Sequence, residues 1–105
     1  MRRVKSTAMI RHIVLFNARS DADPAKLEEM TEGFRRISSK IPSVKNMVVG
    51  KNTSARGSFN MALSCDFETE EDLKAYGPHP EHQRLVHDYM DHLCEAKKEF
   101  SDYDA

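Results

Sequence analysis

The sequence contains no tryptophan and only two cysteines, Cys65 and Cys94, among its 105 residues. Two cysteines are too few for a disulfide framework, and they are not spaced like metal ligands, so we expect a protein of the reducing cytoplasm. The sequence also lacks a large net charge, because it contains 16 Lys and Arg and 17 Asp and Glu. Without a net field to attract phosphate backbones or anionic lipids, neither nucleic acid nor a membrane is an expected partner.

Long hydrophobic runs are absent as well. No segment approaches the roughly 20 apolar residues that span a bilayer. Residues 1–8 are basic and polar with no apolar run behind them, unlike a secretory signal. We therefore expect residues 1–8 to be a flexible extension and residues 9–105 to form one domain. Five Phe, three Tyr and six Met supply the bulky side chains that one core needs.

Four segments have the pattern of β-strands. They span residues 9–17, 44–51, 59–67 and 98–103, and the last is the most polar. The third alternates most clearly, since one face has only small or polar side chains and the other is bulky, with Phe59, Met61, Leu63, Cys65 and Phe67. The first strand is apolar on both faces, which predicts that both faces are covered.

Two helical regions separate these strands. Asp23-Pro24 is a helix start, and Pro42 stops that helix. Its inward stripe is predicted to be Leu27, Met30, Phe34, Ile37 and Ile41. In the second region Thr69 starts a short helix that Gly77-Pro78 breaks. Pro80 then starts another helix, whose predicted inward stripe is Leu85, Val86, Tyr89 and Leu93.

The order of these elements is that of a ferredoxin-like split βαβ domain in the α+β class. Such a domain has a four-stranded antiparallel sheet with helices on one face only. The other face would expose Ile13 and Leu15 of the first strand and the small side chains of the third. A second copy of the chain, packed face to face, is the simplest cover, so we expect a homodimer.

The residues from Tyr76 to His82 are the best candidates for chemistry. His82 falls on the inward stripe of its helix, and His12 lies on the same strand face as Val14 and Phe16. With Tyr76 at the end of the preceding helix, two imidazoles and a phenol could meet at one apolar cavity and serve general acid–base catalysis. An equally simple interpretation gives His82 a role in helix-start hydrogen bonding and makes Tyr76 an aromatic packing residue.

A metal site at His79 and His82 is disfavoured. Two His three residues apart can bind zinc when both project from one helical turn, but Pro80 stands between these two and no third ligand is near. We expect no metal and no organic cofactor.

The chain also resembles a known family, the stress-responsive dimeric α/β-barrel (Dabb) domain. The motifs that match are Met9 to Phe16, Ile41-Pro42-Ser43-Val44, Ala62-Leu63 with Asp66-Phe67-Glu68, His79-Pro80-Glu81-His82, and Asp102-Tyr103. The resemblance implies a dimer whose two sheets close into a barrel. The family includes plant stress proteins and polyketide cyclases whose catalytic Tyr and His match Tyr76 and His82, and His12 matches a pocket histidine. Met61 departs from the pattern, because many members have histidine there.

We therefore expect a homodimeric domain that binds a small apolar or aromatic molecule between helices and sheet. The cavity lining is predicted to be Val14, Phe16, Met30, Phe34, Phe59, Met61, Leu63 and Leu85. One alternative is a cofactor-free cyclase, lyase or monooxygenase acting on a polyketide-like or aromatic substrate, with His82 as base, Tyr76 orienting and His12 assisting. A second alternative is a structural stress protein with no ligand.

Overall fold

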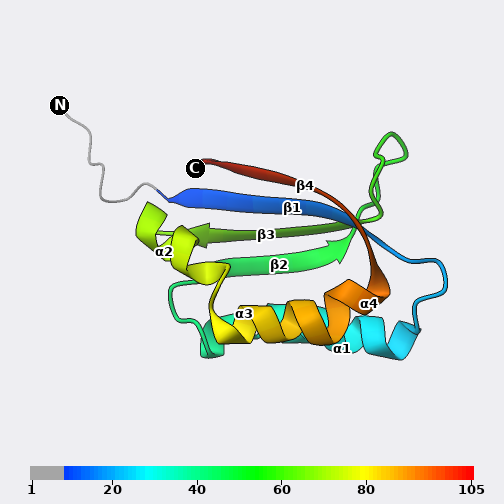
Figure 1. Cartoon of the computed structure of the whole chain (residues 1–105). Coiled ribbons are helices and arrows are strands. Elements are labelled where there is room, and N and C mark those ends of the chain that lie inside the picture. The colour runs from blue at the N-terminus through cyan, green and yellow to red at the C-terminus, as the bar shows by residue number, and fades with distance from the viewer. Residues whose placement is uncertain (1–8) are drawn as a thin grey trace.

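Four antiparallel strands form one sheet in the computed structural model, which describes residues 9–105 (Figure 1). The strands are β1 (Ile10–Ala18), β2 (Lys45–Lys51), β3 (Met61–Phe67) and β4 (Cys94–Asp104). Their order in the sheet is β2-β3-β1-β4, with β3 and β1 at the centre. This is the predicted split βαβ topology; the predicted extension at residues 1–8 lies outside the described residues.

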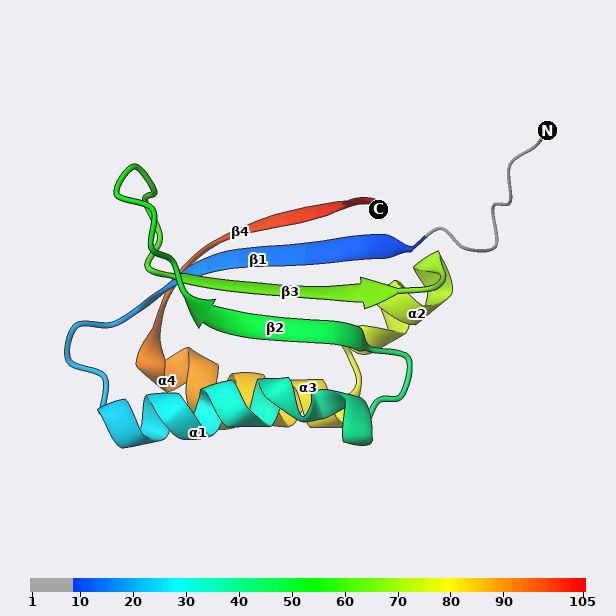
Figure 2. The ribbon, with the colours of Figure 1, turned by 180° about the vertical axis from the view of Figure 1, so that it is seen from behind.

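The helices lie on one face of the sheet, as both views show (Figures 1 and 2). They are α1 (Pro24–Arg35), α2 (Glu70–Tyr76), α3 (Pro80–Leu85) and α4 (Asp91–Leu93). A short 3₁₀ turn, η2 (Ile37–Ser39), follows α1, and a π-helical segment, η3 (Val86–Met90), joins α3 to α4. None of the helices in the described part of the chain is long and apolar enough to cross a membrane.

The first helix starts where predicted but ends early. Asp23 accepts a hydrogen bond from the backbone N–H of Ala25 at 2.9 Å, which caps α1 as expected. The α-helix stops at Arg35 instead of continuing to Ile41. Ser39 Oγ donates to the carbonyl of Arg36 at 2.8 Å, a local bond that competes with helix continuation. The apolar stripe nevertheless continues, because Ile41 is buried in the core.

Two strand starts differ from the prediction by more than one residue. β3 begins at Met61, not at residue 59, because Asn60 replaces ladder pairing with side-chain bonds: its N–H donates to Asn17 Oδ1 at 2.9 Å and its Oδ1 accepts from Ala18 N at 2.8 Å. β4 begins at Cys94, four residues before the predicted start. Most of the residues that follow Cys94 are exposed and polar, so backbone pairing with β1, and not burial, defines this strand.

The helix side of the sheet contains the core. On β3 the predicted bulky face is buried, with Met61, Leu63, Cys65 and Phe67 all nearly inaccessible. α1 packs on α3 through Gly33, where an added Cβ would lie 2.5 Å from Leu85 Cδ2. The π turn shifts the inward stripe by one residue, because it is wider than an α-turn. Met90 is therefore buried, whereas Tyr89, predicted to point inward, places its hydroxyl on Glu29 Oε1 at 3.1 Å.

The other face of the sheet has no helix over it. Val48 is 63% exposed there. At one end of this face Asp66 is only 2% exposed, because Arg11 Nε donates to its Oδ1 at 2.9 Å and Asn46 Nδ2 donates to its Oδ2 at 2.9 Å. The hydrogen bond from Arg11 is the main cause that lowers the pKa of Asp66. Elsewhere this face carries the predicted apolar and small side chains, such as Ile13 and Ala62.

Candidate functional site

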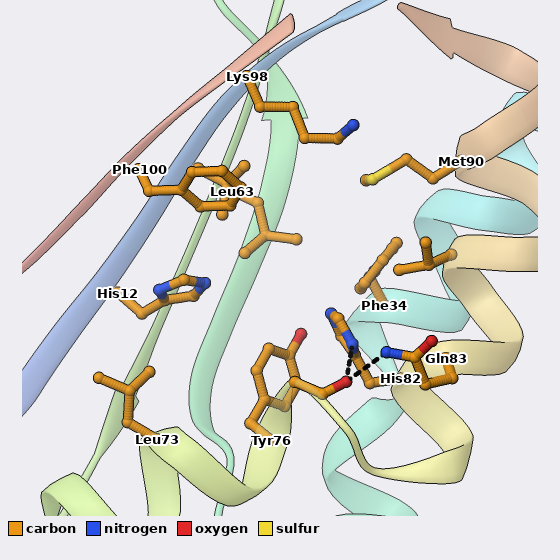
Figure 3. Close-up of a pocket in the computed structure, with 13 residues that line it drawn as sticks. His12, Phe34, Leu63, Leu73, Tyr76, His82, Gln83, Met90, Lys98 and Phe100 are labelled. Carbon is orange, nitrogen blue, oxygen red and sulfur yellow. Dashed lines mark hydrogen bonds between the residues drawn. The ribbon is translucent and has the colours of Figure 1, made fainter. Parts of the chain in front are cut away.

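A cavity of about 380 Å³ opens between the β1–β4 half of the sheet and the helices (Figure 3). Strands β1, β3 and β4 form one wall, α1, α3 and η3 form the other, and α2 closes one end. The walls are mostly apolar, with a few polar groups. The lining consists of His12, Val14, Phe34, Leu63, Leu73, Tyr76, Gly77, His82, Gln83, Val86, Met90, Lys98 and Phe100.

His82 lies near the start of α3 with its ring fixed by the backbone. Its Nδ1 is 2.9 Å from the carbonyl oxygen of Gly77, which can only accept, so Nδ1 carries the hydrogen in this bond. Gln83 Nε2 donates to the same oxygen at 2.7 Å, and both bonds are drawn in Figure 3. Burial lowers the pKa of His82. The ring is therefore held as a neutral tautomer whose Nε2 has a free lone pair.

Tyr76 ends α2 and packs directly against His82. The two ring centroids are 4.3 Å apart, and Tyr76 is buried in the core. Burial also raises its pKa, which keeps the phenol protonated and able to donate. Among the residues drawn in Figure 3 its hydroxyl makes no hydrogen bond. A bound carbonyl or hydroxyl could therefore use both the phenol and the neighbouring imidazole.

His12 forms a second polar group at the cavity wall. Its Nδ1 is 2.6 Å from Asp102 Oδ1, and because a carboxylate accepts, this bond orients the ring and leaves Nε2 for a ligand. The ring lies 6.0 Å from that of Tyr76 and stacks on Phe100 at 6.4 Å. The structure thus brings together the three predicted catalytic side chains, His12, Tyr76 and His82, and adds Asp102.

The predicted ligand-binding residues divide into two groups. Val14, Phe34 and Leu63 line the cavity. The other five do not: Phe16, Met30 and Leu85 are fully buried in the packed core, Met61 faces a separate hollow beside α1, and Phe59 is half-buried in the β2–β3 loop. The prediction treated the whole inward face as one cavity, whereas α1 fills the half nearest β2.

Several lining residues were not predicted. They are Leu73, Gly77, Gln83, Val86, Met90, Lys98 and Phe100. The last two could have been found from strand register, because antiparallel pairing places Lys98 opposite Phe16 and Phe100 opposite Val14, both on the inward face of β1. Met90 could not have been predicted from helix periodicity, because its inward position depends on the π turn.

His79 and Cys65, the candidates for a metal ligand and a nucleophile, have structural roles instead. His79 caps α3, since its Nδ1 accepts from the N–H of Glu81 at 3.1 Å, which occupies the lone pair that a metal would need. Residues 9–105 contain no group of three or more His, Cys, Asp or Glu side chains arranged to hold a metal ion. Burial raises the pKa of the Cys65 thiol to about 12, which is the behaviour of a buried hydrophobic residue and not of a nucleophile.

Residues 10–104 match the model of one protein family, the Stress Responsive A/B Barrel Domain (Dabb). A stress-response A/B barrel domain-containing protein of Arabidopsis thaliana is 29% identical over 89 residues, which cover 83% of this chain. The chain spans only 34% of that relative's length.

Solved structures share the fold. A dimeric protein of unknown function with a ferredoxin-like fold, from Bacteroides fragilis, is 27% identical, with a TM-score of 0.72 over 92% of this chain and 96% of that one. The hydroxynitrile lyase of Passiflora edulis is 18% identical, with a TM-score of 0.80 over 92% of this chain and 93% of that one. The second likeness concerns the fold alone.

Proposed function

This chain belongs to the Stress Responsive A/B Barrel Domain family, and we propose that it is a homodimeric member that binds a small apolar or aromatic molecule between its helices and its sheet. The observation that carries the proposal is the cavity of about 380 Å³. Ligand pockets typically measure about 300–1,000 Å³ and combine apolar walls with a few convergent polar groups. Here those groups are His12, Tyr76 and His82.

Support for the dimer comes from the uncovered face of the sheet. A shallow hollow of about 330 Å³ lies there, with Ile13, Val48, Gly50 and Ala62 among its lining. An exposed Val48 beside small residues suits the flat contact of two sheets, because close approach buries apolar surface without steric conflict. The Bacteroides fragilis protein, which shares the fold, is described as dimeric.

Native mass spectrometry of freshly purified protein tests both parts of the proposal together. We expect a dimer that retains a small molecule, and a loss of the dimer at low micromolar concentration in Val48→Glu, which places two charges in the contact. Thr53→Glu is the matched control, because this residue is exposed in the β2–β3 loop. A folded wild-type monomer at that concentration would contradict the dimer. Dimers that bind no molecule in any screen would favour a structural stress protein.

Catalysis is a second candidate function, and the fixed tautomer of His82 is the observation that favours it. A neutral imidazole with a free Nε2 can take a proton, and the buried phenol of Tyr76 can donate to an oxygen that gains negative charge. The Passiflora edulis neighbour is a hydroxynitrile lyase. In such a cleavage the base takes the hydroxyl proton, the carbon–cyanide bond breaks, the carbonyl forms, and cyanide leaves.

Mandelonitrile, an aromatic hydroxynitrile, is a direct substrate for testing this candidate. Benzaldehyde release above the buffer rate, lost at least about 100-fold in His82→Gln and reduced in Tyr76→Phe, would support catalysis. Circular dichroism would show whether the two variants are folded. Equal rates in wild type and both variants would exclude this reaction.

A further inference from the structure

Lys98 is the one Lys, Arg, Asp or Glu side chain among residues 9–105 that lines the mostly apolar cavity. It lies opposite Phe16 in the antiparallel register of β1 and β4, and is therefore on the helix side of the sheet. Figure 3 shows its amino group reaching from β4 towards Met90, at the end of the cavity away from Tyr76. The side chain is half-buried, so its charge is only partly screened by water.

The cavity supplies no partner for this ammonium group. Lys98 forms no ion pair with any of residues 9–105, and within these residues its ammonium group makes only one hydrogen bond, a long one of 3.5 Å to the carbonyl of Ala96. No Asp or Glu lines the cavity. Asp102, the acid closest in sequence on the same face of β4, is already bonded to His12. Lys98 therefore gives this end of the cavity a positive electrostatic potential that no carboxylate of the cavity lining neutralises.

The two ends of the cavity differ in the groups they offer. The end at Tyr76 and His82 offers a phenol donor and an imidazole lone pair, which suit a neutral hydroxyl or carbonyl. The end at Lys98 offers a cation beside the exposed ring of Phe100. Between them the walls are aliphatic or aromatic, and include Phe34 and Leu63. A ligand that matches this order is apolar in the middle and polar at both ends.

We infer that the ligand is a compact aromatic or apolar carboxylate, whose carboxylate pairs with Lys98 and whose hydroxyl or carbonyl reaches Tyr76 and His82. This inference rests on the proposed function, because it names the chemical class that the proposed binding cavity takes. A charge-assisted hydrogen bond in a partly dry site is stronger than a neutral one, so the carboxylate selects among molecules of the same shape.

A matched pair of probes tests the inference. The probe 6-hydroxy-2-naphthoate is planar, with a carboxylate at one end and a hydroxyl at the other, and 6-hydroxy-2-naphthamide has the same shape without the charge. Affinities of both are measured by fluorescence titration for wild type and for Lys98→Met, which keeps the unbranched apolar stem. Lys97→Met is the control, because this neighbouring lysine is exposed and alternates to the other face.

We expect wild type to prefer the acid to the amide by about tenfold, a difference of about 1.4 kcal/mol. Lys98→Met should lose this preference by weakening the acid alone, Lys98→Arg should retain it, and Lys97→Met should resemble wild type. The inference would be overturned if wild type bound the amide and the acid equally well, or if Lys98→Met weakened the binding of both probes alike. Either result would leave the proposed binding function standing. Binding of neither probe would overturn both.

Discussion

The inward face of the sheet is packed at one end and hollow at the other. Phe16 on β1 is 0% exposed, whereas Phe100 on the adjacent strand β4 is 64% exposed although it faces the same side. The difference follows from position in the sheet, because β1 is a central strand, whereas β4 is the edge strand on the side away from β2, against which α1 packs. We call these the packed half and the open half. His12, Tyr76, His82 and Lys98 all belong to the open half.

This contrast shows how one small domain can be stable and still keep a cavity. The packed half buries large side chains in full, which supplies the free energy of folding. The open half leaves apolar surface for a ligand to cover, and its polar groups are positioned by backbone bonds such as that from His82 to Gly77. A substitution in each half should therefore affect a different property.

Truncation of a large aromatic residue gives the largest expected contrast between the halves. Phe16→Ala should lower the free energy of unfolding by about 3–5 kcal/mol, because it leaves a cavity in a close-packed core. Phe100→Ala should lower it by less than about 1 kcal/mol, because most of this ring is exposed. Urea denaturation followed by circular dichroism measures both. Equal losses would show that the open half is packed in solution.

Overpacking sharpens the comparison with a smaller effect. Val49→Phe, in the packed half, should cost about 1–3 kcal/mol of unfolding free energy, because the extra ring has no space. Val86→Phe should cost less than about 1 kcal/mol, since the ring can enter the cavity. The same Val86→Phe variant should weaken binding of 6-hydroxy-2-naphthoate at least about tenfold. A large stability cost in Val86→Phe would mean that the cavity is filled.

The pH dependence of stability gives the smallest effect. Because burial lowers the pKa of His82 below its ordinary value of 6.5, the unfolded chain binds a proton before the native state does as the pH falls. This residue therefore makes the native state less stable as the pH falls from about 6.5 towards the native pKa. His82→Gln should flatten the decrease between about pH 7.5 and 5.5, measured by urea denaturation at each pH. His87→Gln, which removes an exposed imidazole nearby, is the control, and matching profiles would contradict the assignment.

The fold could be predicted because its signals are local. The period-two pattern of β3, the Asp23 cap of α1 and the Gly77-Pro78 break after α2 each depend on neighbouring residues. The strand boundaries that failed depend on other parts of the chain. β4 is defined by pairing with β1, and the start of β3 is set by side-chain bonds from Asn60 to the end of β1.

The site could be predicted only in part. His12 and His82 could be placed at the cavity because their faces follow from strand and helix periodicity, and Tyr76 because it ends the short helix before Gly77-Pro78. Phe16, Met30 and Leu85 share that periodicity, yet they are core residues, because periodicity reports the side of the sheet and not which half α1 fills. Lys98 and Asp102 were not predicted as site residues, because charged side chains on an edge strand usually point into solvent. The register of β1 and β4 is what places both on the same face of the sheet as His12.

The central claim is that the open half binds a small molecule, and methyl-resolved NMR during titration with 6-hydroxy-2-naphthoate tests it most directly. The account predicts saturable shifts at Val14, Leu63 and Val86 in the cavity, with Val49 of the packed half and Val48 of the outer sheet face unchanged. Saturable shifts centred on Val48, or no shifts at the cavity methyls at millimolar probe, would contradict it.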